Sequence, residues 1–383
     1  MAACDAIFEK IEELYEAYLD IWEDVCKIES PTAYKKGVDA VGNYFIEMAK
    51  KRGWQVEIFE QPVAGNVIAI TLNPESKEKP VTLSGHIDTV FPLGVFPPSA
   101  VHRDAENLYA PGSRDCKGGV VACFLAMEAL WQCGFKARPV QLLIQSDEET
   151  GSKTSEKATI RYICEKAKNS IAFINTEGST DGQAVLKRKG IWRCEFIVHG
   201  KAAHSSLCMN GANAIAEAAY KIPELEKMKD KAGLTCNIGV ITGGTVANTV
   251  AETCRFVADI RFSDANELAE ARKIIANVAE TTHIEGCSCE VKEISYRPAM
   301  PLCERNMKLL EQMNAVFAEN ALPILAVGES LGGSDAAYAT EYGIPCVDSL
   351  GVAGGPVHSN NEYGNLRSLA LSAKQMASVA YCI

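Results

Sequence analysis

Apolar and polar residues follow two different periods along the first half of the chain. Residues 6–28 and 37–51 place apolar side chains at every third or fourth position, which predicts two amphipathic helices. Further helical patterns cover 117–133 and 155–166, and short apolar runs of strand length lie between the helices. The predicted strands are Gln55–Phe59, Asn66–Leu72, Pro80–Leu83, Val140–Gln145 and Ile171–Asn175. Strands that alternate with helices predict a mostly parallel sheet flanked by helices.

The order of elements changes after Lys187-Arg188-Lys189-Gly190. The next segment has a β-α-β-β-α-β order, which is typical of a ferredoxin-like α+β domain. Its predicted elements are strand Trp192–Val198, helix Ala212–Lys229, strands Leu234–Ile241 and Cys254–Arg261, helix Glu267–Thr282 and strand Ser288–Ile294. Alternation of helix and strand resumes near residue 300. We therefore predict an α/β domain formed by 1–187 and 300–383, with 188–299 inserted as a smaller domain.

Composition and charge exclude several classes of function. Of the 383 residues, 47% are apolar and 23% charged, which is typical of a globular protein. The net charge of −11 would repel a phosphate backbone, so we expect no nucleic-acid partner. The longest apolar stretch, Val120–Leu130, contains Glu128 and is too short to span a bilayer, so no membrane insertion is expected.

The fifteen cysteines are scattered without a metal-binding or redox spacing. No Cys-x-x-Cys occurs, and the nearest approach is Cys287-Ser-Cys289, which argues against zinc fingers and thioredoxin-like chemistry. The first residues lack both a basic start and an apolar signal core. An odd number of unpatterned thiols without a signal peptide predicts a reducing, cytoplasmic location.

Five short segments combine metal-binding side chains with turn-forming residues. They are Ser84-Gly-His86-Ile-Asp88, the glycine-rich run around Asp115, Asp147-Glu148-Glu149-Thr-Gly151, Asn175-Thr-Glu177-Gly178 and Gly354-Gly-Pro-Val-His358. Successive candidates from His86 to Glu177 are 29, 34 and 28 residues apart, each about one strand-helix unit. Because the carboxyl ends of parallel strands share one edge of a sheet, we expect these side chains to converge there. His358 follows Glu177 by 181 residues, most of them in the inserted domain.

Two histidines and three carboxylates are a suitable ligand set for two divalent cations. Zn²⁺ is the expected ion, with Mn²⁺ or Co²⁺ as alternatives. If one carboxylate bridges, the two ions would lie about 3.5–4 Å apart. The adjacent Glu148 and Glu149 supply one residue to bind metal and one to act as a base, and spacing alone leaves open which is which.

Together these motifs resemble the two-domain, di-zinc aminoacylase and carboxypeptidase family. That family includes glutamate carboxypeptidase, acetylornithine deacetylase, succinyl-diaminopimelate desuccinylase and tripeptidase, and the resemblance covers nearly the whole chain. It implies a zinc-exopeptidase-like catalytic domain with an inserted lid and dimerisation domain. By this resemblance His86, Asp115 and Glu177 hold one metal, and Asp115 bridges to a second metal held by Glu149 and His358.

The same resemblance assigns roles to residues that do not bind metal. Glu148 is expected to be the general base, and Asp88 to be the carboxylate that orients His86. A cis peptide bond is expected at Asp115–Cys116, because the family has one after the bridging aspartate.

The inserted domain also carries motifs that resemble the family. His204, in Gly200-Lys-Ala-Ala-His204-Ser, resembles a histidine that reaches the active site of a neighbouring subunit and stabilises an oxyanion. Asn248 and Arg261 resemble residues that bind substrate, and Arg297 is a further candidate. A surface role for His204 and a structural ion pair for Arg261 or Arg297 remain as alternatives. The resemblance implies a homodimer formed through the inserted domain.

The last third of the chain looks closest to glutamate carboxypeptidases, through Tyr296–Met300, Gly332–Tyr338 and Ser349–Ser359. We therefore expect a metallohydrolase that cleaves an amide bond next to a free carboxylate in a small peptide or N-acyl amino acid. The alternatives are a deacylase of N-acyl amino acids, which would use the same site, and a catalytically silent relative that binds metal or peptide.

Overall fold

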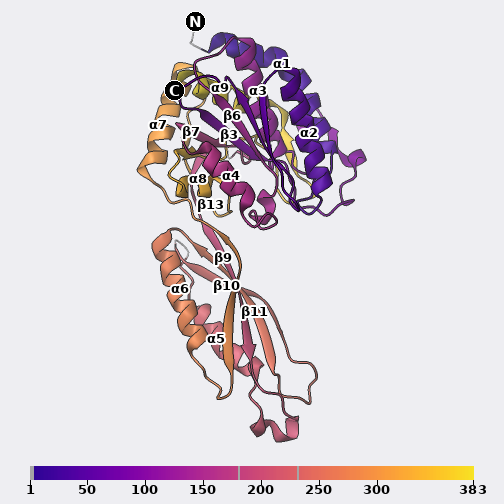
Figure 1. Ribbon diagram of the computed structural model, residues 1–383, viewed down its shortest axis with the longest axis vertical. Coiled ribbons are helices and arrows are strands. Elements are labelled where there is room, and N and C mark those ends of the chain that lie inside the picture. Colours follow the sequence, from indigo (N-terminus) through magenta and orange to yellow (C-terminus); the bar gives the residue numbers. More distant parts are fainter. Residues whose placement is uncertain (1–3, 180–181, 231–232) are drawn as a thin grey trace. The chain divides into compact units, whose positions relative to one another are not determined.

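The computed structural model describes residues 4–179, 182–230 and 233–383, and the chain divides into two compact units (Figure 1). The first unit comprises Met1–Lys187, Leu302–Glu329 and Ser334–Ile383, and the second comprises Arg188–Pro301 and Ser330–Gly333. Each unit has its own hydrophobic core. Within the described ranges, no helix combines the length and apolarity needed to cross a membrane.

A six-stranded sheet forms the centre of the first unit, with the order β1-β2-β6-β3-β7-β14. Its strands are β1 (Gln55–Phe59), β2 (Val67–Leu72), β6 (Val140–Gln145), β3 (Val81–His86), β7 (Ala172–Asn175) and β14 (Cys346–Val347). β2 is antiparallel to both of its neighbours, whereas the pairs from β6 to β14 are parallel. The predicted mostly parallel sheet is therefore confirmed with one exception. β2 is reversed because residues 60–66 are too short for a crossover connection.

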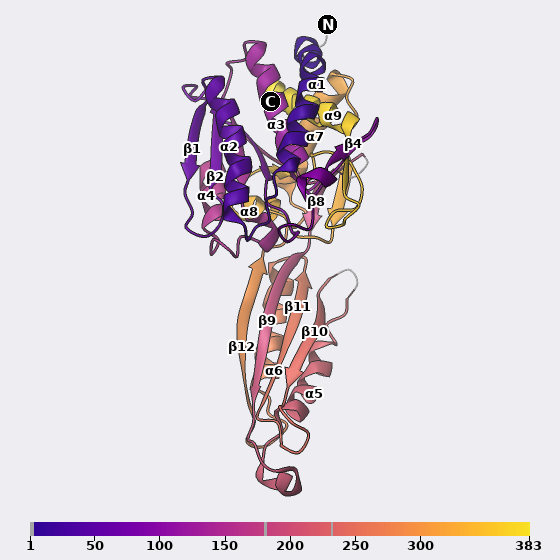
Figure 2. The ribbon, with the colours of Figure 1, turned by 90° about the vertical axis from the view of Figure 1, so that its right-hand side faces the viewer.

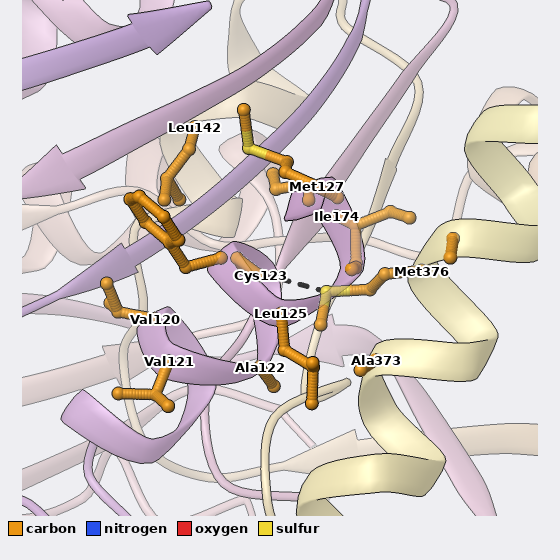
Figure 3. Close-up of a cluster of buried hydrophobic side chains, with 14 of the residues drawn as sticks. Val120, Val121, Ala122, Cys123, Leu125, Met127, Leu142, Ile174, Ala373 and Met376 are labelled. Atoms are coloured by element: carbon orange, nitrogen blue, oxygen red, sulfur yellow. Dashed lines mark hydrogen bonds between the residues drawn. The ribbon is translucent and has the colours of Figure 1, made fainter. Parts of the chain in front are cut away.

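Helices flank this sheet, as predicted (Figure 2). They are α1 (Asp5–Lys27), α2 (Lys35–Lys51), α3 (Lys117–Gln132), α4 (Ala158–Ala167), α7 (Glu304–Glu319), α8 (Ala336–Glu341) and α9 (Leu366–Cys382). α1, α2, α3 and α9 share one core with alternate strand residues such as Leu142 and Ile144, while α4 contacts β6 and α8 contacts β14. α3 is buried along almost its whole length, which explains why it is apolar on every side. Figure 3 shows α3 packed against α9, where the sulfur atoms of Cys123 and Met376 lie 3.6 Å apart.

Several short elements of the first unit were not predicted from the sequence. β4 (His102–Arg103), β5 (Asn107–Tyr109) and β15 (Tyr363–Asn365) form a three-stranded sheet, and β8 (Gln183–Arg188) pairs with β13 (Ala326–Ser330). Two single turns of 3₁₀ helix, η1 (Pro98–Ala100) and η2 (Glu148–Thr150), complete the unit. Two of these elements matter for the site, because η2 carries Glu149 and β15 follows the loop that carries His358.

The second unit is an antiparallel sheet of order β10-β11-β9-β12 with two helices, so the predicted ferredoxin-like order is confirmed. Its elements are β9 (Gly190–His199), η3 (Ser205–Asn210), α5 (Ala214–Leu225), β10 (Thr235–Gly243), β11 (Thr253–Phe262), α6 (Ala265–Glu280) and β12 (Ser288–Arg297). The Asn213 and Asp264 side chains accept hydrogen bonds from the first N–H groups of α5 and α6. The α5 helix is shorter than the predicted 212–229, and β12 extends beyond Ile294 to Arg297.

A buried ion pair links α5 to the C-terminal end of α6. Lys221 Nζ lies 3.0 Å from Glu217 Oε1, and each side chain is only 1% exposed. Lys221 Nζ also donates to the carbonyl oxygen of Thr281 at 2.5 Å, while Glu217 Oε2 accepts the N–H of Ile284 at 2.7 Å. The two side chains therefore bind the main chain at the end of α6 as well as each other.

Replacement of Lys221 by methionine is expected to destabilise the second unit by about 3–5 kcal/mol, because it leaves the Glu217 carboxylate buried without its counter-ion. Chemical denaturation of the full chain measures this loss. Lys227→Met is the control, since Lys227 pairs with Glu224 on the exposed surface of the same region and should leave the unfolding midpoint unchanged. Equal midpoints for the two variants would contradict the expected role of the pair.

Candidate metal centre

His86 is the last residue of β3 and is 1% exposed. Its Nδ1 lies 3.1 Å from the carbonyl oxygen of Asp88 and 3.4 Å from Asp88 Oδ1. Its Nε2 lies 2.9 Å from Asp115 Oδ1. Asp88 therefore contacts one ring nitrogen, and the other ring nitrogen faces the candidate centre. The predicted strand stopped at Leu83 because Ser84 and Gly85 interrupt its apolar pattern.

Asp115 lies between two histidines, His86 and His358, that are far apart in the sequence. Its Oδ1 faces His86 Nε2, and its Oδ2 lies 3.2 Å from His358 Nε2. Burial acts to raise the pKa of Asp115, but hydrogen bonding to His358 and His86 outweighs burial and holds the pKa well below its usual range. The cis peptide bond expected at Asp115–Cys116 is present. Asp115 thus offers one oxygen to each histidine.

Glu149 and Glu177 complete the cluster. Glu149 Oε2 lies 3.1 Å from His358 Nε2, and Glu177 Oε2 lies 3.9 Å from His86 Nε2. Two sets of ligand atoms result, each lying within 4.8 Å of one another. They are His86, Asp115 and Glu177, and Asp115, Glu149 and His358. Across residues 4–179, 182–230 and 233–383 these are the only such sets, and Asp115 belongs to both.

The charges of this cluster suit a divalent cation. Burial raises the pKa of Glu149 to about 8, with a contribution from the charges of Asp115 and Glu148 and against the hydrogen bond to His358. Burial, together with the charges of Asp115 and Glu148, also holds the pKa of Glu177 well above its usual range. Hydrogen bonds to Asp115 and Glu149 raise the pKa of His358 to about 10. Crowded carboxylates with imidazole nitrogens beside them form a donor set that fits zinc or a similar ion.

Asp88 connects the end of β3 to the turn that carries Glu148 and Glu149. It is fully buried, and its carboxylate accepts hydrogen bonds from the N–H groups of Glu148 and Glu149, each at 3.1 Å. The hydroxyl of Thr32 donates to the same carboxylate at 2.7 Å. Glu148 itself is 6% exposed and belongs to neither set of ligand atoms. Thr32 was not predicted, because nothing in the sequence marks a threonine 56 residues before Asp88 as its partner.

Comparison with known proteins identifies the family of this chain. The model of peptidase family M20/M25/M40 matches residues 82–381, which include every residue of the two ligand sets. The chain belongs to this family. It is a metallopeptidase-type hydrolase that acts on amide bonds.

Individual relatives agree with this assignment. Carboxypeptidase G2 from Pseudomonas sp. (strain RS-16) is 26% identical over 374 residues, which cover 95% of this chain and 89% of that protein. A tripeptidase from Staphylococcus aureus has the same fold, with a TM-score of 0.77 at 22% identity over 96% of this chain and 98% of that one. YXEP from Bacillus subtilis, described as a dinuclear metal binding peptidase, has a TM-score of 0.70 at 16% identity over 97% and 98% of the two chains.

Two residues of this M20-family chain contact the loops of the candidate metal centre but were not predicted from the sequence. Arg114 donates from Nη1 to the carbonyl oxygen of Gly355 at 2.9 Å and from Nη2 to that of Ser179 at 3.0 Å. The carboxylate of Glu362 accepts the N–H groups of Arg114 and Asp115, both at 3.0 Å. Burial and the charge of Asp115 raise the pKa of Glu362 to about 7. The sequence contains only one signal for these two residues: Arg114 adjoins Asp115, and Glu362 lies close to His358.

The remaining candidates lie in the second unit, where His204 and Asn248 are both exposed. They lie on neighbouring segments, since the N–H of Ser205 donates to the carbonyl oxygen of Asn248 at 2.9 Å. The Nδ1 of His204 is 2.8 Å from Ser206 Oγ. The structure therefore brings these two candidates close to each other on the surface of the second unit.

Arg261 forms an ion pair within its own strand. Its Nε lies 2.6 Å from the carboxylate of Asp259, two residues earlier in β11. Asp259 also approaches Arg193 of β9, at 2.7 Å, and therefore lies between two arginines. These contacts hold the pKa of Asp259 below its usual value, although burial acts in the opposite direction.

Arg261 and Arg297 occupy matching positions in the sheet of the second unit. Arg261 of β11 and Arg297 of β12 both pair with Ile191 of the intervening strand β9, so they lie on the same face at the same level. Arg297 is 8% exposed and lies against Gly333, where a Cβ atom would come within 2.4 Å of its Cδ.

Proposed function

We propose that the chain is a two-metal, glutamate-carboxypeptidase-like exopeptidase that cleaves an amide bond next to a free carboxylate. The observation that carries the proposal is the arrangement of Asp115, whose two oxygens face two different histidines. In this proposal His86, Asp115 and Glu177 hold the first ion, and Asp115, Glu149 and His358 hold the second. Zn²⁺ is the expected ion, and Mn²⁺ or Co²⁺ would suit the same nitrogen and oxygen donors.

Bound ions of this kind polarise a substrate carbonyl and lower the pKa of water. Proton transfer then falls to Glu148, which adjoins Glu149 but is not one of the clustered ligands. Glu148 takes a proton from the attacking water and passes it to the leaving amine. Asp88 supports both metal binding and proton transfer, since it contacts His86 and accepts the N–H of Glu148. Asp88 acts through these neighbours and does not touch the substrate.

The second unit would supply substrate contacts and the dimer interface. We assign His204 to oxyanion stabilisation in the partner subunit's site, and Asn248, Arg261 and Arg297 to substrate binding, with a carboxylate as the natural ligand of the arginines. The ion pair between Arg261 and Asp259 supports the structural alternative for Arg261. Arg261→Lys would distinguish a substrate-binding role from a structural one. Loss of a substrate contact would raise KM and leave the unfolding midpoint unchanged.

A homodimer through the second unit is supported by the edge strand β10. Val240 is 58% exposed and Ile241 is 51% exposed on this strand, which pairs on one side only among the described strands. Exposed apolar residues on a free strand edge favour pairing with another chain. We expect Ile241→Asp to convert a dimer to a monomer in light scattering and to lower turnover. Ile324→Asp, at a residue 64% exposed in the first unit, is the control and should leave the assembly unchanged. A fully active monomeric wild type would refute this interface.

Substrate preference is tested with zinc-reconstituted protein and a panel of N-blocked amino acids. The match to carboxypeptidase G2 supports release of a C-terminal residue. The resemblance of the last third of the chain to glutamate carboxypeptidases favours glutamate as that residue, released from folyl-glutamate or a dipeptide. Hydrolysis of N-acetyl or N-succinyl amino acids alone would instead identify a deacylase that uses the same metal centre. A protein that binds two ions but hydrolyses nothing in the panel would favour the catalytically silent alternative.

A further inference from the structure

One side chain binds the loops on both sides of the candidate metal centre. Arg114 precedes Asp115, and its guanidinium donates to the carbonyl oxygens of Ser179 and Gly355. Ser179 follows the ligand Glu177 by two residues, and Gly355 precedes the ligand His358 by three. Through one guanidinium, the Asp115 loop is therefore hydrogen-bonded to the segments that carry two other ligands.

The main chain of Arg114 is hydrogen-bonded, as is its side chain. Glu362, 4% exposed, accepts the N–H groups of both Arg114 and Asp115. The loop that runs from Gly355 to Glu362 is closed at its base, because the N–H of Gly355 donates to the carbonyl oxygen of Tyr363 at 2.9 Å. Both ends of the His358 loop are thus hydrogen-bonded to the Asp115 loop, Gly355 to the Arg114 side chain and Glu362 to the main chain of Arg114 and Asp115.

The arrangement requires the Arg114 side chain to approach Gly178 closely. A Cβ atom at Gly178 would lie 2.7 Å from Arg114 Nε, so a larger residue there would displace the guanidinium. Nε is itself buried and, among the described residues, has no hydrogen-bond partner. The guanidinium is therefore oriented by its two bonds to main-chain carbonyls, at the cost of one unsatisfied N–H group.

His358 is the ligand that depends most on such support. Its side chain is 53% exposed, and its φ of 56° is in the left-handed region that non-glycine residues rarely adopt. His86 and Glu149, by contrast, have side chains only 2% and 6% exposed. An exposed ligand on a loop is placed by what holds the loop.

We propose that Arg114 is a positioning residue that pre-organises the second ion position, formed by Asp115, Glu149 and His358. This inference rests on the two-ion function proposed above. Partners that orient metal ligands contribute roughly 10–100-fold to metal affinity. The first position should depend on Arg114 less, because His86 lies at the end of a central strand and is held there by Asp88.

The test compares zinc binding by the full-length wild type and Arg114→Met after removal of metal with a chelator. Titration with Zn²⁺ against a competing chromophoric chelator gives the two dissociation constants without any activity measurement. We expect Arg114→Met to weaken the second binding event about 10–100-fold and the first event much less. Arg114→Lys keeps the charge and one donor group, so it should recover part of the lost affinity. If Arg114→Met fails to fold, Arg114→Lys carries the same comparison with a smaller shift.

Arg138→Met is the matched control. Arg138 also donates to two main-chain oxygens, those of Lys79 at 3.2 Å and Ile383 at 2.8 Å, but it lies before β6, at the end of the strand away from the candidate metal centre. The control should leave both dissociation constants unchanged. Unchanged constants in Arg114→Met, or an equal loss at both positions that Arg138→Met reproduces, would overturn the inference. A wild type that binds fewer than two ions would overturn the proposed function itself, and the positioning role with it.

Discussion

Replacement of Glu148 by glutamine should lower turnover by about 10²–10⁴-fold while both ions remain bound. Glutamine keeps the shape of the side chain but cannot accept and return a proton. Glu148 is outside both sets of ligand atoms, so its loss should not reduce metal content. Steady-state kinetics with elemental analysis of the same preparation measures both quantities.

The control for this variant is Glu165→Gln. Glu165 lies on the exposed face of α4 and pairs with Lys168, so its replacement should change neither turnover nor metal content. Full activity of Glu148→Gln would refute its role as the base. Loss of an ion together with activity would instead make Glu148 a ligand and leave the base unassigned.

Asp115→Asn should lose at least one of the two ions, and turnover should fall by about a thousandfold or more. An amide offers only one oxygen, whereas the two oxygens of Asp115 face His86 and His358 at 2.9 and 3.2 Å. In the proposed two-metal mechanism, loss of an ion would remove several kcal/mol of charge stabilisation in the transition state, which corresponds to a factor of this size. Elemental analysis and kinetics at saturating zinc test the expectation.

A surface aspartate provides the comparison for Asp115→Asn. Asp20, whose side chain is 71% exposed beside Arg103, should tolerate the same change without loss of metal or activity. Retention of two ions by Asp115→Asn would contradict a bridging role. Rescue of its activity by excess zinc would show that only the affinity, and not the ligand set, had changed.

The central architecture was predictable because long periodic segments determine it. The apolar period of α1 and the uniformly apolar α3 each show which surfaces are buried. The direction of β2 was not visible in its apolar run, since a fully buried strand has the same pattern in either direction. Strand pairing of two or three residues, as in β4 and β15, depends on tertiary contacts that no local pattern carries.

The candidate site was predictable to the extent that ligands follow strands in one sheet. His86, Glu149 and Glu177 lie at or just after the carboxyl ends of β3, β6 and β7, so their convergence follows from the topology. No such rule predicts contacts between loops that are distant in the sequence. Glu362 reaches Asp115 over a separation of 247 residues, and only the folded loop after His358 brings them together.

Diffraction from crystals grown with zinc, measured at the zinc absorption edge, tests the account most directly. Two anomalous peaks are expected. One should lie among His86, Asp115 and Glu177, and the other among Asp115, Glu149 and His358. Absence of density between these side chains, or a zinc peak bound elsewhere, would contradict the two-metal centre on which the proposed hydrolysis depends.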